Sequence, residues 1–280
     1  MRFVVGRGSC GNAAGAGEIF NYLQDKGLDV SFAGCVGACY LEPIVDVYEG
    51  DAKIATYVKV GMDAIASIAD GCADAYKIED TDADILAAQK RVALGNCGII
   101  NPEDINEYIA KDGYAAIKTA VTNSTPEDVI EEIKTSGLAG RGGAGFPTWF
   151  KWNACKNSPG DEKYIICNAD EGDPGAFMDR AIIEGDPHAV IEGMMIGGFA
   201  MGAEHGIVYV RAEYPLAIHR LEIALGQARE RGFLGKNIFD SNFNFDIYIK
   251  AGAGAFVCGE ETALIASLEG ERGMPRLKPP

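Results

Sequence analysis

"HGIVYVRAEYPLAIHRLEIALGQARERG", residues 205–232, begins with a short apolar run and continues as a longer segment with helical spacing. The short run predicts a buried strand, and the longer segment predicts a helix. A second apolar run, "FDIYIKAGAG" at 245–254, follows and predicts another strand. A strand, a helix and a strand in this order predict a layered α/β domain.

The preceding segment repeats this order. "KYIICNAD" at 163–170 predicts a buried strand, and "PHAVIEGMMIGGFAMG" at 187–202 predicts the helix after it. Strands that alternate with helices in this way indicate an α/β, Rossmann-like domain, which we assign to residues 125–280.

That domain opens with "STPEDVIEEIKTSG" at 124–137. Thr125 is the expected N-cap, Pro126 stands in the first turn, and Gly137 is the expected stop. This predicted helix leads directly into a glycine-rich stretch.

The N-terminal residues 1–75 predict a separate small module. Its elements follow the order β-α-β-β-α, which suits a thioredoxin-like sheet. The expected strands, helices and hairpin are 2–6, 15–27, 29–34, 43–60 and 62–71. Residues 76–124 are then a helical connector, with helical runs at 82–94 and 102–113.

Bulk properties exclude several classes of protein. The 280 residues carry a formal net charge of −16, which argues against a nucleic-acid or anionic-membrane surface. The longest apolar stretch, at 190–203, contains Glu192 and is shorter than the roughly 20 residues of a membrane span. The N-terminus does not read as a secretory signal, so we expect a cytoplasmic protein. Its eight cysteines then suit thiols or metal ligands better than disulfides.

"GRGGAGFPTWFKW" at 140–152 places four glycines immediately before several aromatic residues. Such glycines allow positive φ and let a phosphate lie close to main-chain N–H groups. The spacing is not that of a Walker loop, and alone it suits a tight turn equally well.

Two further loops add to this signal. "CNADEGDPGAFMDR" at 167–180 places acidic and amide side chains after a predicted strand, where α/β sheets bind ligands. "AGAGAFVCGEETALIASLEG" at 251–270 again sets glycines before an aromatic residue and then a pair of glutamates. Those glutamates could simply stabilise the dipole of the helix that they open. They could also bind ribose hydroxyls or a carboxamide. Three such loops on one domain favour a large nucleotide-like ligand.

The three loops together resemble the signature loops of the FMN- and NADH-binding subunit of complex-I-like NADH dehydrogenases. The N-terminal module and the motifs "GDPGAF" and "RAEYP" most closely resemble the flavin-bearing beta subunit of NAD(P)-linked, electron-bifurcating iron hydrogenases and related formate dehydrogenases. The resemblance covers nearly the whole chain and is strongest from residue 125 onward.

The resemblance implies a binding site for FMN and for NAD(H) or NADP(H). The glycine loop would approach both ligands, Phe146 would stack on the nicotinamide nucleotide, and Lys151 would contact the flavin. The second loop would line the FMN side, and Phe256, Glu260 and Glu261 would lie where flavin and nicotinamide meet. The complete implied set is Gly140, Arg141, Gly142, Gly143, Gly145, Phe146, Lys151, Asn168, Asp170, Glu171, Asp173, Phe256, Gly259, Glu260 and Glu261. No protein acid or base is assigned, because flavins carry hydride chemistry themselves.

Two residues depart from the family pattern. Asp173 stands where many relatives carry glutamate, and Phe256 stands where many carry tyrosine. A shorter carboxylate near the adenine ribose would repel a 2′-phosphate less, so the choice between NADH and NADPH stays open.

The N-terminal module resembles the family's thioredoxin-like 2Fe-2S module, whose pattern is C-x4-C followed by C-x3-C. Cys10, Cys35 and Cys39 match three of the four ligands, and Val5 occupies the position of the first. Two interpretations remain: a cluster with an unusual fourth ligand, or a degenerate module of buried thiols used for docking. The missing ligand favours the second, since a closed site without it loses much of its affinity.

The other cysteines and the histidines show no metal-type spacing, so we expect them to be structural. They are Cys72, Cys97, Cys155, Cys167 and Cys258, with His188, His205 and His219. In the family the sequence continues past "RLKPP" into a region with a 4Fe-4S motif. We therefore expect that cluster, and the exit for electrons, in further sequence or in a partner.

These features predict a flavin-dependent diaphorase subunit of a multisubunit redox complex, of hydrogenase or formate dehydrogenase type. Its expected partners are other redox subunits, including a small iron–sulfur subunit. Two alternatives are a non-catalytic docking subunit and a flavin-free regulatory protein that binds pyridine nucleotides. Bound flavin would separate the first prediction from both.

Overall fold

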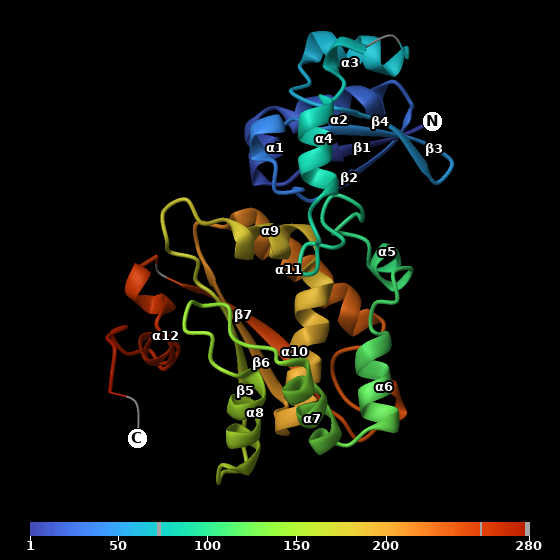
Figure 1. The fold of residues 1–280 in the computed structure, drawn as a ribbon. Helices are drawn as coiled ribbons and strands as arrows, with labels where there is room; N and C mark the ends of the chain where they lie inside the picture. The colour runs from blue at the N-terminus through green and yellow to red at the C-terminus, as the bar shows by residue number, and fades with distance from the viewer. Residues whose placement is uncertain (72–73, 253, 278–280) are drawn as a thin grey trace. The chain divides into compact units, whose positions relative to one another are not determined.

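The fold is described from a computed structural model, which covers residues 1–71, 74–252 and 254–277. The chain forms two compact units. The first comprises Met1–Glu107 with Phe177–Pro187, and the second comprises Tyr108–Ala176 with His188–Pro280. Each unit is built on its own sheet (Figure 1).

The sheet of the first unit has the strand order β2-β1-β3-β4. β1 pairs in parallel with β2, while β3 is antiparallel to both β1 and β4. α2 and α3 share one apolar core with β1 and β3, because the inward-facing residues of these strands alternate along the chain. The predicted β-α-β-β-α order is confirmed. The elements are β1 (Arg2–Gly6), α2 (Ala16–Asp25), β2 (Asp29–Ala33), β3 (Val45–Glu49), β4 (Ala52–Tyr57) and α3 (Met62–Ala69).

Several short elements complete this unit. α1 and a 3-10 turn, η1, carry the cysteines of the module, and α9 joins the unit from the later part of the chain. Their bounds are α1 (Ser9–Ala13), η1 (Cys39–Leu41), η2 (Asp74–Tyr76), α4 (Asp80–Ala87) and α9 (Met178–Gly185).

The predicted helical run at 82–94 is wrong in its second half, because α4 ends at Ala87. The following segment instead turns inward. Cys97 and Ile100 are buried there, and the Arg91 guanidinium donates to the Val36 carbonyl at 2.5 Å. These tertiary contacts replace the intrahelical hydrogen bonds that the sequence spacing suggested. The second connector run, at 102–113, forms only the short helix α5 (Ile105–Ile109).

The second unit contains a parallel sheet with the order β5-β6-β7. The long helices α10 and α11 precede and follow the central strand, as predicted for an α/β domain (Figure 1). A Cβ on Gly197 of α10 would lie 2.5 Å from Ile165 of β5, so glycine permits the close packing of helix and sheet. The elements are α6 (Ala115–Asn123), α7 (Pro126–Ser136), α8 (Thr148–Asn157), β5 (Tyr164–Ala169), α10 (Pro187–Met201), β6 (His205–Arg211), α11 (Pro215–Glu230), η3 (Ile238–Asp240), β7 (Asp246–Gly252), η4 (Phe256–Gly259) and α12 (Glu261–Leu268).

The three strands differ in burial. The central strand β6 is largely buried, but the predicted burial of β5 and β7 is only partly correct, since Tyr164 and Tyr248 are exposed. In a sheet of three strands, only the middle one has neighbours on both sides.

The helix predicted at 124–137 forms as α7 with the expected ends. The Asp128 amide donates to Thr125 Oγ1 at 3.2 Å, and the Thr125 amide donates to Asp128 Oδ2 at 2.9 Å, so the helix begins with a capping box. Gly137 ends it with φ at +70°. Within the described residues, no helix is both long and apolar enough to cross a lipid bilayer.

Candidate functional site

The glycine loop between α7 and α8 is closed at its base and open at its tip. The Gly140 amide donates to the Phe146 carbonyl at 2.8 Å, and the Thr148 amide donates to the Leu138 carbonyl at 3.0 Å. At the tip, Gly143 has φ +98° and Gly145 has φ +61°. A Cβ added to Gly142, Gly143 or Gly145 would meet no protein atom within 4 Å. The backbone at the tip is therefore free to lie against a ligand.

The aromatic residues after the glycines connect this loop to the third one. The Phe146 ring makes an edge-to-face contact with Phe150 at a centroid distance of 5.6 Å. The Lys151 ammonium lies 5.8 Å from the Phe146 ring centre and 2.9 Å from Oε2 of Glu261. The structure thus brings three of the predicted site residues together.

The second and third loops also touch. The Asn168 side-chain amide donates to the Gly259 carbonyl at 2.8 Å. A Cβ on Gly259 would lie 3.2 Å from the Asp170 carbonyl, and a Cβ on Gly172 would lie 2.9 Å from the Phe256 ring. Glycine at both places lets the loops approach this closely. The two loops leave the carboxyl ends of parallel strands β5 and β7, which is the edge where α/β sheets bind ligands.

The carboxylates of the second loop differ in environment. Asp170 Oδ2 is buried and has no hydrogen-bond partner within the described part of the chain. Burial raises the pKa of Asp170, although nearby Arg211 opposes the shift. Glu171 is buried and accepts a hydrogen bond from the Tyr214 hydroxyl at 3.1 Å, whereas Asp173 is exposed. Asp170 is the carboxylate that a ligand donor would satisfy.

The two glutamates of the third loop have separate roles in the fold. Oε2 of Glu260 accepts from the backbone amides of Thr262 at 2.9 Å and Ala263 at 3.0 Å, so Glu260 caps α12. Glu261 pairs with Lys151. Beside them Phe256 is 69% exposed, and this large apolar face is available for stacking.

Sequence reasoning did not single out two residues that support this site. Arg211 donates to the Glu171 carbonyl and forms an ion pair with Glu213, and Tyr214 holds the Glu171 side chain. Arg211 is the last residue of the central strand β6. Its place at the carboxyl end of a predicted parallel strand is the signal that could have found it.

The open glycine tip, the exposed aromatic rings and the orphaned Asp170 oxygen fit a flat, phosphate-bearing cofactor such as FMN. Gly142, Gly143 and Gly145 would lie along its phosphate, and Phe146 and Phe256 would lie against rings. Arg141 belongs to the same exposed tip.

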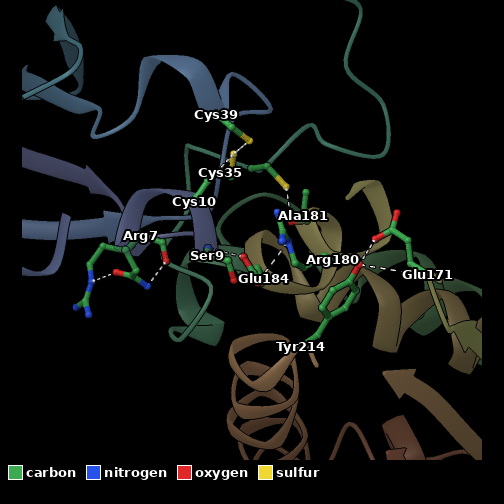
Figure 2. Close-up of polar contacts among 12 residues, drawn as sticks. Arg7, Ser9, Cys10, Cys35, Cys39, Glu171, Arg180, Ala181, Glu184 and Tyr214 are labelled. Atoms are coloured by element: carbon green, nitrogen blue, oxygen red, sulfur yellow. Dashed lines mark hydrogen bonds and ion pairs between the residues drawn. The ribbon is translucent and has the colours of Figure 1, made fainter. Parts of the chain in front are cut away.

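The first unit contains a second candidate site. The sulfur atoms of Cys10, Cys35 and Cys39 all lie within 4.8 Å of one another (Figure 2). The distance from Cys10 Sγ to Cys35 Sγ is 3.3 Å, and that from Cys35 Sγ to Cys39 Sγ is 3.8 Å. Within the described ranges this is the one group of three or more potential metal-binding side chains with such spacing. The predicted three-thiol group is therefore assembled.

The three thiols differ in pKa. The hydrogen bond between Cys10 and Cys35 lowers the pKa of Cys10 to about 6 and raises that of Cys35, and the Arg180 guanidinium also favours the Cys10 thiolate. Burial raises the pKa of Cys39. Since a metal binds thiolates, a bound cation would displace the protons that the other two thiols retain.

Helix α9 fixes the segment that carries Cys10. Glu184 is 1% exposed and accepts from the Ser9 amide at 2.8 Å and from the Ser9 hydroxyl at 2.5 Å (Figure 2). Arg180 lies 3.9 Å from the same carboxylate. These contacts set the position of α1 and hence of the first thiol.

Among the residues that the structure describes, the remaining cysteines and the buried histidine join no metal-type group. Cys97 and Cys258 are buried, and the Cys97 thiol donates to the Ala181 carbonyl at 3.7 Å. Cys155 and Cys167 are half-buried, and Cys72 lies outside the described residues. His188 contacts the Tyr114 hydroxyl at 2.8 Å and the Gln227 side chain at 3.2 Å, which fits a core histidine.

Comparison with known proteins identifies the relatives of this chain. Residues 133–280 match the family model described as the Nuo51 FMN-binding domain. The NADP-reducing hydrogenase subunit HndC of Solidesulfovibrio fructosivorans is 60% identical over 192 residues, which are 69% of this chain and 39% of that protein. A subunit of an NADH-quinone oxidoreductase of Rhizobium meliloti (strain 1021) is 50% identical over 189 residues, covering 68% of this chain and 45% of the relative.

A solved structure is similar over the whole chain. The crystal structure of an NAD+-reducing [NiFe]-hydrogenase in the H2-reduced state superposes with a TM-score of 0.53 at 27% identity, covering 100% of this chain and 48% of that one. The chain thus spans less than half the length of these relatives. The predicted resemblance and the α/β fold are confirmed. Because its family model covers more than half of the residues, the chain belongs to the Nuo51 FMN-binding domain family of oxidoreductase subunits.

Proposed function

We propose that the chain transfers hydride between NAD(P)H and FMN, and that its electrons pass singly to iron–sulfur centres in a multisubunit redox complex. The convergence of three glycine-rich loops at the carboxyl edge of a parallel sheet carries this proposal. Two of these loops also present exposed aromatic rings, which suit the stacking of two flat ring systems.

The roles of the residues follow from their positions. The glycine tip binds phosphate through its amides, Lys151 and Glu261 join the first loop to the third, and Asp170 accepts a hydrogen bond from the ligand. When bound, FMN supplies the exchange between two-electron and one-electron chemistry. The protein contributes orientation and electrostatics. The distance between the Asp173 carboxylate and the ribose sets how strongly a 2′-phosphate is repelled, and so decides whether NADPH is accepted as well as NADH.

The names of the relatives support a complex of hydrogenase or complex I type. We extend the proposal to a cytoplasmic diaphorase subunit of a hydrogenase or formate dehydrogenase, including the electron-bifurcating type, with a 4Fe-4S centre in further sequence or a partner. Within the chain, the proposed division is a module at 1–75, a connector at 76–124 and a cofactor domain at 125–280. The three thiols of the module are a second candidate cofactor site, which would take part in electron transfer if it holds a 2Fe-2S cluster.

Gly142→Ala tests this proposal. A Cβ at this position meets no protein atom and needs no unusual φ, so the variant should fold like the parent chain. If the tip lies against a ligand, the added methyl group should weaken FMN or NADH binding about tenfold, which is ~1.4 kcal/mol. Fluorescence titration of both ligands and NADH-dependent dye reduction measure this effect.

Gly193→Ala is the matched control. Gly193 is an exposed glycine of α10 whose added Cβ also meets nothing, so ligand affinity should not change. Equal affinities in all three proteins would mean that the loop is only a turn. A chain that takes up no FMN would favour the docking-subunit alternative.

A further inference from the structure

A buried carboxylate lies beside the three thiols. Glu42 follows Cys39 by three positions, and its side chain is turned inward, leaving the residue 8% exposed. Its Oε1 lies 4.0 Å from Cys10 Sγ. Its Oε2 accepts a hydrogen bond from the Ile44 amide at 2.9 Å, which fixes the direction of the group. Glu42 is therefore a fourth potential ligand on the edge of the thiol cluster.

The backbone makes room for this carboxylate. A Cβ on Gly6 would lie 2.9 Å from Glu42 Oε2, and a Cβ on Gly11 would lie 3.1 Å from the same atom. Gly6 directly follows Val5, which occupies the position where the resemblance expects a cysteine ligand. Val5 itself is fully buried in the apolar core with α2 and α3. The carboxylate thus lies next to the ligand position that Val5 leaves without a donor.

The charges around Glu42 do not compensate its burial. Burial and the negative charges of the Cys10 thiolate and Asp46 disfavour its ionised form, and the Ile44 amide is the group that favours it. Its hydrogen bonds within the described residues are the one to Ile44 and the long contact with Cys10. A buried carboxylate stays ionised when it is paired with a cation or coordinated to a metal, and otherwise takes up a proton. A metal ion at the thiols would supply the missing positive charge.

The spacing of the ligand atoms is compatible with metal binding. Two ligands on one tetrahedral metal, each about 2.3 Å from it, lie roughly 3.8 Å apart. The neighbouring pairs here are 3.3 Å apart for Cys10 and Cys35, 3.8 Å apart for Cys35 and Cys39, and 4.0 Å apart for Cys10 and Glu42. The group whose ligand atoms all lie within 4.8 Å of one another comprises the three sulfurs alone, so Glu42 approaches the cluster from the Cys10 side. Both carboxylate and thiolate are established ligands of tetrahedral metals.

We propose that Glu42 is the fourth protein ligand of a metal centre held by Cys10, Cys35 and Cys39. Three thiolates and one carboxylate suit a thiophilic tetrahedral metal, which is either the iron of a 2Fe-2S cluster or a zinc ion. This centre has its own ligands in the first unit and does not depend on the flavin function proposed above.

The experiment compares the full chain with its Glu42→Ala and Glu42→Cys variants after anaerobic reconstitution with iron and sulfide or with zinc alone. Metal per chain, the visible spectrum and the electron paramagnetic resonance spectrum of the reduced protein are measured. We expect about two irons or about one zinc per parent chain. The alanine variant should retain metal at least about tenfold less tightly. The cysteine variant should bind metal tightly; with iron its absorption and resonance spectra should differ from the parent's.

Asp46→Asn is the matched control, because Asp46 is a buried carboxylate of the same module that bonds Lys53 and Thr56 instead of the thiols. Its metal content should equal that of the parent chain. Unchanged metal affinity in Glu42→Ala would overturn the proposal. If that variant does not fold, an iron-loaded Glu42→Cys protein with the parent's spectra would overturn it instead. A parent chain that binds neither metal and forms a Cys10–Cys35 disulfide would also overturn it. FMN binding, measured on the same samples, separates these outcomes from a failure of the flavin proposal.

Discussion

At the scale of single residues, Asp170 makes stability depend on pH. Burial raises its pKa above the ordinary value of 3.8, so the folded chain holds this proton more tightly than the unfolded chain. Its contribution to stability is present below that ordinary value and is lost as pH rises through the raised pKa. We expect Asp170→Asn to remove this loss in the ligand-free chain, so that its melting temperature falls less than the parent's across this range.

Thermal melting between about pH 3.5 and 7 measures the effect. Asp173→Asn, in the same loop but exposed, is the control and should keep the parent's profile. Parallel profiles for Asp170→Asn and the parent would contradict the assignment. The same substitution should also weaken any ligand whose donor satisfies Asp170 Oδ2.

The residue scale also shows where sequence reasoning stops. The type and neighbourhood of the acidic side chains could be predicted, and Lys151, Phe146 and Glu261 do lie together. The direction in which each carboxylate points could not be predicted from the sequence. Glu171 turns to Tyr214 and Glu260 turns to the amides of its own helix, because each oxygen takes the nearest available donor. Those donors come from the folded backbone and from another strand, and the local sequence does not reveal them.

At the scale of elements, the helix that leads into the glycine loop depends on its cap. Thr125→Ala removes the acceptor of the Asp128 amide and should destabilise the chain by about 1 kcal/mol. Thr119→Ala is the control, because Thr119 is an exposed threonine inside α6 whose hydroxyl only bonds the Ala115 carbonyl. Urea unfolding followed by circular dichroism measures both. Equal losses of unfolding free energy in the two variants would show that the capping box does not stabilise the chain more than an ordinary helix hydroxyl does.

Elements were predictable where local chemistry sets their ends. α7 has Thr125, Pro126 and Gly137 at the expected places, and all strands of both sheets were found. α4 was predicted too long, since the inward turn of Cys97 is a tertiary contact. α9 was not predicted at all: it follows a loop of glycine and proline and is held by Glu184, whose partner Ser9 is far away in sequence.

At the scale of the whole molecule, the chain crosses between its two units within a few residues. Glu184 of α9 belongs to the first unit and Glu192 of α10 belongs to the second. Each is a buried carboxylate that anchors a distant segment. Glu184 holds Ser9, while Glu192 accepts from the Tyr108 hydroxyl at 2.6 Å and from the Tyr114 amide at 2.8 Å. Two neighbouring helices therefore anchor two different cores.

Alanine at these two positions should destabilise two different segments of the chain. Glu184→Ala leaves two Ser9 donors without an acceptor, and Glu192→Ala does the same to donors in 108–117, at a cost of about 2 kcal/mol or more each. Amide hydrogen exchange of the full chain should accelerate in β1 and α1 for the first variant and in residues 108–117 for the second. If both variants accelerated exchange equally throughout the chain, the two units would open as one. Separate responses would mean that the two units have independent local stabilities. The thiol site of the first unit could then open while the second unit stays folded.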